Sequence, residues 1–255
     1  MLNRNLIYYL LRKEIKSLYI GSTLGMLWII LRPLLIIVVF WLVFSEIMKV
    51  RPYAGKVNVP YIVFMLSTIF FWFGFQEGIM RASTSVIENG EIIKKVQMPI
   101  EVFPVVSVLS SYFNHIIGAV IFFFAIAALY SPSVMWVLVI PVIVLQILFS
   151  LGLGFLLSAL AAYVRDIPQI VNIIMQGLFF LTPIVYPIDI VPEKVRFLFY
   201  LNPMTYFVKT YQDLIIFRVF PHYSTIIIVF VLSVASFFIG LKVFRKLKEG
   251  FADIL

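Results

Sequence analysis

The sequence predicts an all-α integral membrane protein with six transmembrane helices. Hydrophobic residues make up 63% of the 255 positions and charged residues only 13%, whereas a soluble domain is about one-quarter charged. Apolar runs of about 20 residues, the length of a helical span, alternate with short charged loops. A transmembrane barrel would instead alternate polar and apolar residues over segments of about ten. We therefore expect one transmembrane domain over residues 1–255.

The first segment, residues 4–20, is predicted to be an amphipathic helix lying on the membrane surface. Apolar and basic side chains fall on opposite faces at helical spacing, as in helices that lie at an interface. The alternative is a positively charged flank that only sets the topology. The apolar face holds Tyr8, Leu11, Ile15 and Leu18, and the basic face holds Arg12, Lys13 and Lys16.

Six apolar stretches follow the surface helix, the first of them after a bend marked by Gly21 and Gly25. Short charged or proline-containing segments separate the stretches, as expected of helices that cross a bilayer in succession. The expected spans are residues 27–48, 60–81, 104–130, 134–162, 167–186 and 223–244.

A few charged residues fall inside or at the ends of these spans. Arg32 lies about one turn past Trp28, where its side chain can reach the membrane surface; the alternative role is an anion contact at a pore entrance. Glu77 and Arg81 are four residues apart and favour an intrahelical ion pair over a proton relay. Because Glu46 and Glu77 are both expected near span ends, no acidic residue is predicted at midplane depth. This argues against a proton- or sodium-coupled carrier.

Two segments are expected to lie outside the regular spans. Residues 86–101 predict a short cytoplasmic helix, ended by Pro99, on which a soluble protein could dock. Residues 187–221 are too charged to cross a bilayer and too apolar for water, so we expect two re-entrant helices broken at Asn202-Pro203. With six spans, the side that holds both termini carries most of the 20 Lys and Arg residues, which places the termini in the cytoplasm. Residues 187–221 then face outward.

Several kinds of chemistry have no support in the sequence. The one Gly-Lys pair, Gly55-Lys56, lacks the rest of a Walker loop, so we do not expect this chain to hydrolyse ATP itself. No cofactor or metal site is predicted, because His115 and His222 lack metal-ligand spacing and the chain has no cysteine. We expect both histidines to be structural. The net charge of +8 reflects topology and anionic lipid headgroups, and we find no nucleic-acid motif.

Aromatic residues are abundant, with 26 Phe, 13 Tyr and 4 Trp. Most are expected to face lipid or to form interfacial belts. Aromatic faces also suit sugar rings, because the apolar side of a pyranose can lie on them without a fixed register. The candidates for contact with such a polymer in a pore are Trp28 and Trp41 on the first span and Phe179, Phe180 and Tyr186 on the fifth.

Three motifs carry a resemblance to a known family: Arg165 to Ile170 (RDIPQI), Leu181 to Pro187 (LTPIVYP) and Leu201 to Thr205 (LNPMT). In this order and spacing they resemble the membrane subunit of type 2 ATP-binding-cassette exporters. The most similar branch exports bacterial polysaccharides such as O-antigen, capsule and teichoic acid. The amino-terminal pattern of surface helix and first span is also similar, although Lys13-Glu14 stand where the family more often has Arg-Asp.

The resemblance implies a homodimer in the bacterial inner membrane that moves lipid-linked polysaccharide with two ATP-binding subunits, which bind the ATP and Mg. It assigns three sets of residues. The ATPase-coupling set is Asn89, Glu91, Ile92, Ile93, Lys94, Lys95 and Pro99. Basic residues that could contact the lipid diphosphate at the cytoplasmic surface are Arg4, Arg12, Arg32 and Arg165. The gate set is Pro187, Asn202, Pro203 and Met204.

Three other functions stay open. The chain could export a smaller hydrophobic drug or lipid within the same superfamily. It could be a membrane glycosyltransferase, which would need Asp189, Glu193 and Asp213 to converge as acid and base groups. It could also be a scaffold that anchors soluble proteins, although a scaffold would not need charged, gate-like helices on the far side.

Overall fold

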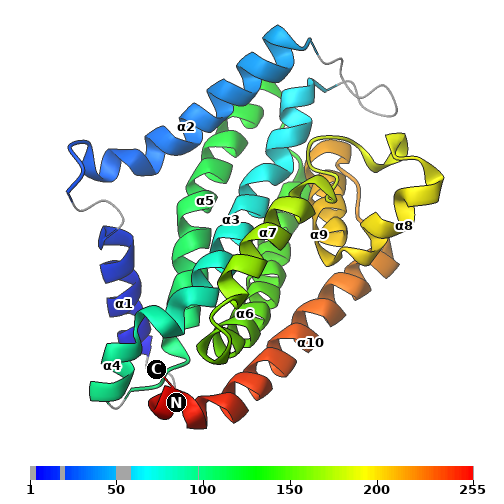
Figure 1. Ribbon diagram of the computed structural model, residues 1–255. Helices are drawn as coiled ribbons and strands as arrows, with labels where there is room; N and C mark the ends of the chain where they lie inside the picture. The colour runs from blue at the N-terminus through cyan, green and yellow to red at the C-terminus, as the bar shows by residue number, and fades with distance from the viewer. Residues whose placement is uncertain (1–3, 18–20, 50–58, 97, 255) are drawn as a thin grey trace.

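A computed structural model describes residues 4–17, 21–49, 59–96 and 98–254, and every regular element in these ranges is helical (Figure 1). Residues 18–20 of the predicted surface helix and residues 51–56 of the first outer loop, Gly55-Lys56 included, lie outside the described ranges. Within them, five helices are long and apolar enough to cross a membrane, and a sixth apolar helix is shorter. The fold is that of a helical integral membrane protein.

The elements follow one another in a simple order. The segment predicted as a surface helix forms α1 (Arg4–Ser17), and the bend predicted at Gly21 and Gly25 is present, since both have positive φ. The five long helices are α2 (Trp28–Phe40) with its π-helical extension η2 (Trp41–Ile47), α3 (Tyr61–Glu88), α5 (Val102–Leu129), α6 (Val139–Tyr163) preceded by η3 (Val134–Leu138), and α10 (Tyr223–Leu247). The shorter elements are α4 (Gly90–Lys95), α7 (Ile167–Phe180), η4 (Ile188–Ile190), α8 (Glu193–Leu201), α9 (Pro203–Gln212), η5 (Asp213–Phe217), η6 (Lys248–Gly250) and α11 (Phe251–Ile254).

α3 forms the centre of the bundle and continues further than predicted. Its most apolar stretch is 72% buried, whereas that of α2 and η2 is only 6% buried. α5 and α6 pack along α3 (Figure 1). We expected the second span to end near Arg81, but α3 continues to Glu88, so the loop predicted over 86–101 begins inside it.

α6 and α10 approach each other most closely at two glycines. A Cβ atom on Gly240 would overlap the carbonyl oxygen of Gly152, and one on Gly152 would overlap the backbone of Ser236. α2 approaches α5 in a similar way at Gly118, where a Cβ would meet Phe70 and Pro33. The glycines at these crossings therefore determine how closely the helices approach each other.

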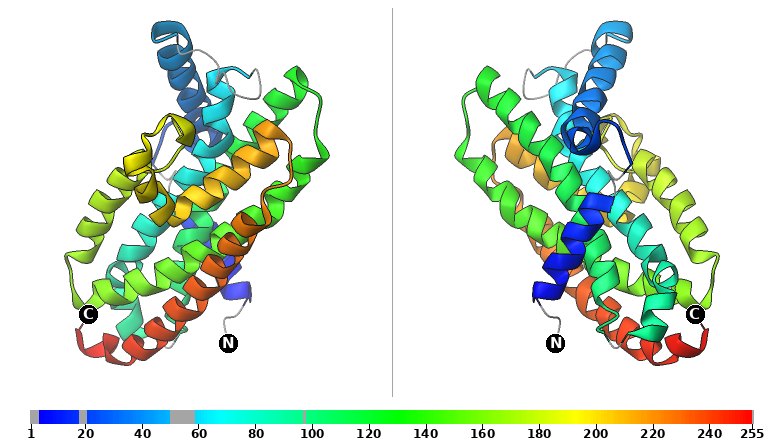
Figure 2. Two further views of the ribbon diagram at one scale, coloured as in Figure 1. Left: turned by 90° about the vertical axis from the view of Figure 1, so that its right-hand side faces the viewer. Right: turned by 90° about the vertical axis from the view of Figure 1, so that its left-hand side faces the viewer.

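α7 is shorter than the span predicted over 167–186. It has 14 residues and is therefore about 21 Å long, against the roughly 30 Å of a hydrocarbon core. It ends at Phe180 because Leu181 to Pro187 contains Pro183 and Pro187, and the chain there forms turns. α7 nevertheless returns the chain from the end that holds both termini towards α8 and α9 (Figures 1 and 2).

The predicted break in the 187–221 segment is present. Asn202 caps α9 by accepting a hydrogen bond from the Met204 amide at 3.0 Å, and Pro203 occupies the first turn. α9 is not a surface element: Met204, Phe207 and Tyr211 are almost fully buried against the bundle. α8 is more exposed and extends to one side of the molecule (Figure 1).

Candidate functional site

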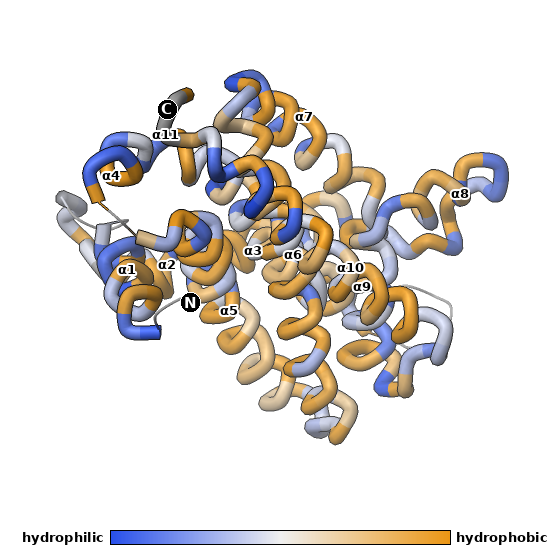
Figure 3. The backbone as a smooth tube through the Cα atoms, turned by 90° about the horizontal axis from the view of Figure 1, so that it is seen from below, coloured by the Kyte–Doolittle hydropathy of each residue, from blue (hydrophilic) through white to orange (hydrophobic). Residues whose placement is uncertain are grey.

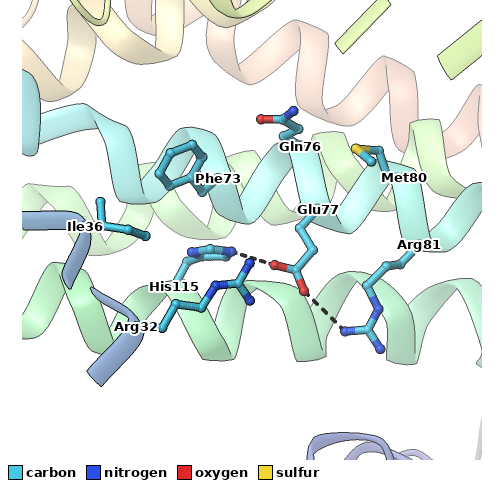
Figure 4. A pocket seen from close by; sticks show the side chains of 8 residues that line it. All are labelled: Arg32, Ile36, Phe73, Gln76, Glu77, Met80, Arg81 and His115. Carbon is cyan, nitrogen blue, oxygen red and sulfur yellow. Dashed lines mark hydrogen bonds and ion pairs between the residues drawn. The ribbon is translucent and has the colours of Figure 1, made fainter. Parts of the chain in front are cut away.

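A polar pocket lies between α2, α3 and α5 (Figure 4). Its volume is about 320 Å³, enough for a headgroup-sized ligand. Charged side chains reach it from two helices that are otherwise strongly apolar. The lining residues are Arg32 and Ile36 from α2, Phe73, Gln76, Glu77, Met80 and Arg81 from α3, and His115 from α5.

Glu77 is the centre of the charge arrangement in this pocket. Its Oε2 lies 2.7 Å from His115 Nε2, and its Oε1 accepts a hydrogen bond from Arg81 at 3.5 Å. These partners matter because an unpaired carboxylate inside a span is costly. Arg32 points into the same pocket from α2 (Figure 4) but makes no hydrogen bond or ion pair with the described residues. The hydrogen-bond donors of its guanidinium are therefore available in the pocket, while its charge also acts on Glu77.

α1 is connected to this pocket through an ion pair. Arg81 forms an ion pair with Glu14 of α1 as well as with Glu77. On the same side of the bundle, Leu6 and Leu10 of α1 pack against the first turns of α5, around Phe103. A movement of α1 would therefore change the ion pairs of Arg81, which lines the pocket.

Two expectations about these charges can be compared with the structure. The predicted ion pair of Glu77 with Arg81 is present. The second span was expected to end near Arg81, whereas α3 continues about three turns beyond Glu77, to Glu88. The position of Glu77 near the end of a span stays a prediction, as does the argument against an ion-coupled carrier that rests on it. His115 is buried and supports Glu77 by a hydrogen bond.

The predicted coupling residues form a compact surface around α4 at the end of the bundle that holds the termini (Figures 1 and 3). Asn89 ends α3 by donating to the Ser85 carbonyl at 2.8 Å, and Glu91 pairs with Lys95 at 2.8 Å. Ile92 and Val96 are exposed. A hollow of about 640 Å³ beside α4 is lined by Ile93, Lys94, Lys95, Val96, Met98, Pro99 and Ile100. Exposed apolar side chains next to lysines suit a protein partner.

An ion pair connects this surface to the carboxyl-terminal tail. Lys248 Nζ lies 2.6 Å from Glu101 Oε1, and Arg245 Nε lies 4.0 Å from the same oxygen. Burial alone would raise the pKa of the Glu101 carboxyl, but the hydrogen bond from Lys248 and the charge of Arg245 bring this pKa below its ordinary value. The charged carboxylate is thus favoured in the folded protein.

This ion pair predicts a pH dependence. Because the folded pKa of Glu101 is below its unfolded value of about 4.5, its stabilising contribution is present at neutral pH and is lost as pH falls through the folded pKa. Glu101→Gln should therefore lower the thermal midpoint at pH 7 and reduce the part of the acid destabilisation that falls below pH 4.5. Thermal unfolding in detergent at pH 7 and pH 3.5 measures both, with Glu88→Gln as control. Equal pH responses of Glu101→Gln and the original chain would contradict it.

Of the predicted gate residues, Pro187 ends the turn that follows α7, whereas Asn202, Pro203 and Met204 begin α9 and lie against that turn. Asn202 donates to Thr182 Oγ1 at 2.8 Å and to the Leu181 carbonyl at 3.1 Å. Gln212 donates to the Pro183 carbonyl at 2.7 Å, and the Tyr61 hydroxyl donates to the Val185 carbonyl. The turn that follows α7 is therefore hydrogen-bonded to α3 and to α9. Asn202, at the start of α9, makes two of these hydrogen bonds.

Comparison with known proteins supplies the family. Residues 5–216 match the family model described as "ABC-2 type transporter". This chain belongs to the ABC-2 type transporter family. It is 30% identical over 255 residues to an O-antigen export system permease protein, RfbA, of Klebsiella pneumoniae, covering 98% of this chain and 95% of the relative. An RfbA of Myxococcus xanthus is 28% identical over 254 residues, with the same coverage.

The four arginines predicted to contact a diphosphate occupy different places in this ABC-2 transporter chain. Arg32 lines the pocket. Arg4 and Arg12 are exposed on α1, and Arg165 is exposed in the turn between α6 and α7. Among the described residues, no hydrogen bond or ion pair brings any of these three to Arg32. The structure thus assigns one of the four to a formed cavity.

Three of the five predicted pore aromatics, Phe179, Phe180 and Tyr186, lie together, whereas Trp28 and Trp41 lie at opposite ends of α2. Phe179 packs against Phe180 at 5.3 Å and against Trp72 of α3 at 6.0 Å, and the Tyr186 hydroxyl donates to the Phe180 carbonyl. On the other side, Trp28 donates to Ser22 Oγ at 3.0 Å and Trp41 is 45% exposed. No ring contact between the α2 and α7 groups occurs in the described parts of the chain.

Sequence reasoning missed several residues that the fold brings into these sites. Glu14 reaches the charges of the pocket only through the packing of α1, whereas Phe73 and Gln76 lie on α3 within about one turn of Glu77. Asn172 and Gln176 form an exposed hydrogen-bonded pair at 3.1 Å on α7. The four-residue spacing of this polar pair within an apolar helix was a signal available in the sequence.

Proposed function

We propose that this chain is the permease subunit of an ATP-driven exporter of lipid-linked polysaccharide of the O-antigen type. The observation that carries the proposal is the similarity to O-antigen export permeases over 98% of the chain. In this proposal the chain works as a homodimer with two ATP-binding subunits in the bacterial inner membrane. ATP and Mg are bound by those subunits and not by this chain.

The exposed face of α7 supports a pore between two copies. Ile170, Ile173 and Phe180 are 47–65% exposed there, and the polar pair of Asn172 and Gln176 is exposed beside them. A polar pair is costly against lipid but suits a face that lines a water-filled path or meets a second protein. We propose that α7 and the following turn together make the sixth crossing, with Phe179, Phe180 and Tyr186 against the moving glycan.

The two ends of the molecule then have different roles. The termini and α4 lie at the cytoplasmic end, as the distribution of basic residues favours. The ATP-binding subunit docks on α4 through the exposed Ile92 and its neighbouring lysines. α8 and α9 lie at the outward end, where Asn202 holds the turn after α7 and gates the exit.

Arg32 contacts the diphosphate of the substrate lipid in this mechanism. Its guanidinium makes no hydrogen bond with the described residues, lines a cavity of about 320 Å³ and belongs to the candidate span with the smallest buried share. Charge-assisted hydrogen bonds to phosphate are stronger than neutral ones. Arg165, Arg4 and Arg12 add positive charge along the path to the cavity.

We expect Arg32→Gln to reduce export at least about tenfold, since a lost charge-assisted hydrogen bond costs on the order of 1.5–3 kcal/mol and about 1.4 kcal/mol is a factor of ten. Arg165→Gln should have a smaller effect, because its side chain lies outside the pocket. Surface polysaccharide, measured by immunoblot in cells that express each variant, is the readout. Lys242→Gln, an exposed cation on α10, is the matched control.

The class of protein is tested separately by purifying the tagged chain in mild detergent and identifying what co-purifies. We expect an ATP-binding subunit at one copy per copy of this chain, and its loss in Ile92→Asp. Normal export by Arg32→Gln would remove Arg32 from the mechanism and leave the exporter intact. The absence of any ATP-binding subunit with the original chain would refute the exporter itself.

A further inference from the structure

A second, unassigned site lies at the opposite end of α5 and α6 from the chain termini. An apolar groove of about 440 Å³ runs between these two helices on the outside of the bundle. A smaller pocket of about 260 Å³ lies near the start of α6. Trp136 lines both, so the two hollows adjoin at its indole ring.

The groove has the dimensions of one lipid chain. Its wall on α5 runs from Ile116 to Ala127 and is therefore about 17 Å long, close to half of the roughly 30 Å hydrocarbon core. Ala119 and Val139 form a buried floor, while Phe124 and Ile140 are 75% and 63% exposed at the rim. Every lining residue is apolar.

The smaller pocket has a different chemistry. Arg218 and Tyr130 line it together with apolar side chains. The Arg218 guanidinium lies over the Trp136 ring, 5.8 Å from its centroid, and the indole nitrogen is occupied by the Ile215 carbonyl at 3.2 Å. With the described residues, neither the Arg218 guanidinium nor the Tyr130 hydroxyl makes a hydrogen bond or an ion pair. Two donors are thus available at the head of the groove.

We propose that these adjoining hollows bind one phospholipid with an anionic headgroup, from the leaflet at the end of the bundle away from the termini. The phosphate accepts hydrogen bonds from Arg218 and Tyr130, and one acyl chain lies in the groove between α5 and α6. The positive charge of Arg218 selects an anionic headgroup. Trp136 lies between the polar pocket and the apolar groove, as interfacial tryptophans lie between headgroups and acyl chains. The site is distinct from the charged pocket at Glu77, and its argument requires only that the chain spans a membrane.

The backbone holds Arg218 in an unusual conformation, which determines the choice of a test variant. Arg218 has φ 55°, in the left-handed region, where it ends η5 immediately before the turn into α10. Arginine is not a residue that prefers this conformation. An asparagine tolerates it better, so Arg218→Asn removes the charge without adding backbone strain.

Lipid binding can be measured on the full-length chain by native mass spectrometry in detergent, with phosphatidylglycerol and phosphatidylcholine as probes. We expect one phosphatidylglycerol to be retained at least about tenfold more tightly than phosphatidylcholine, as for one charge-assisted contact. Arg218→Asn should abolish this preference, and Ala127→Leu should weaken both lipids by filling the groove. Lys194→Gln, an exposed cation on α8, should bind like the original chain.

Three results would overturn the proposal. The first is equal retention of both lipids by the original chain, or an unchanged preference in Arg218→Asn. The second is displacement of phosphatidylglycerol by excess inorganic phosphate, which would make the site one for a free anion. The third is a change of oligomeric state in Ala127→Leu, which would mean that a second copy of the chain covers the groove. Circular dichroism distinguishes a misfolded Ala127→Leu from a folded chain that has lost the lipid.

Discussion

Replacing Gly240 by alanine is expected to prevent most of the protein molecules from reaching the native fold. The added Cβ would overlap the carbonyl oxygen of Gly152 across the contact between α6 and α10. A backbone oxygen cannot move aside as a side chain can, so the two helices must separate. Overpacking costs typically 1–3 kcal/mol even where side chains can adjust, and here we expect more.

Separation of α6 from α10 is also expected to affect contacts that these two helices make with other parts of the protein. α10 carries the tail whose Lys248 pairs with Glu101, and α6 contributes Gln146 and Ser150 to the polar contacts of the core. Separation of α6 from α10 would therefore disturb both the α4 surface and the core. The small-residue contact is the kind on which close packing of membrane helices depends.

The monodisperse fraction after detergent extraction, followed by the thermal midpoint of that fraction, measures the effect. Gly177→Ala is the matched control, because its Cβ would meet nothing within 4 Å and alanine favours a helix by about 1 kcal/mol over glycine. A Gly240→Ala protein as monodisperse and as stable as Gly177→Ala would show that α6 and α10 are less closely packed than described.

Gln146→Leu should detach α9 from the core of the bundle. The Gln146 side chain donates to the Phe71 carbonyl at 3.1 Å and accepts from the Tyr211 hydroxyl at 2.6 Å, so it joins α6 to α3 and α9. It is fully buried, as is Tyr211. Leucine would leave the buried Tyr211 hydroxyl without this partner, which costs about 1–3 kcal/mol.

The expected result is a lower thermal midpoint together with faster proteolysis between α8 and α10. If α9 holds the turn after α7 as proposed, export should also fall or become uncontrolled. Gln176→Leu, the same exchange at an exposed position of α7, should not change the thermal midpoint. Tyr211→Phe distinguishes loss of the hydrogen bond from loss of apolar packing. It removes the same hydrogen bond but keeps the ring that stacks on Phe71 at 4.2 Å.

An unchanged thermal midpoint in Gln146→Leu would mean that apolar packing alone holds α9 in place. If Gln146→Leu and Tyr211→Phe both lower the thermal midpoint, the hydrogen bond between Gln146 and Tyr211 is what holds α9.

The membrane class, the five long helices and the break at Asn202-Pro203 follow from the sequence itself. Runs of apolar residues are local properties, and a bilayer requires that each run satisfy its own backbone hydrogen bonds within a helix. Proline acts locally too, which is why the end of α7 and the start of α9 lie where Pro183 and Pro203 favour them. The order of the motifs near Arg165, Thr182 and Asn202 indicated the family.

Contacts between distant helices were decided only by the tertiary structure. Glu77 and His115 are far apart in the sequence, and the packing of α3 against α5 brings them to one pocket, while α1 contributes Glu14 through its ion pair with Arg81. Packing likewise brings Arg218 to Tyr130 and Trp136, and Gly240 of α10 to Gly152 of α6. The second span was predicted to end near Arg81, but α3 continues to Glu88, an extension that hydropathy alone does not indicate. Local patterns determine which segments become helices, whereas the shapes of their surfaces determine which side chains meet.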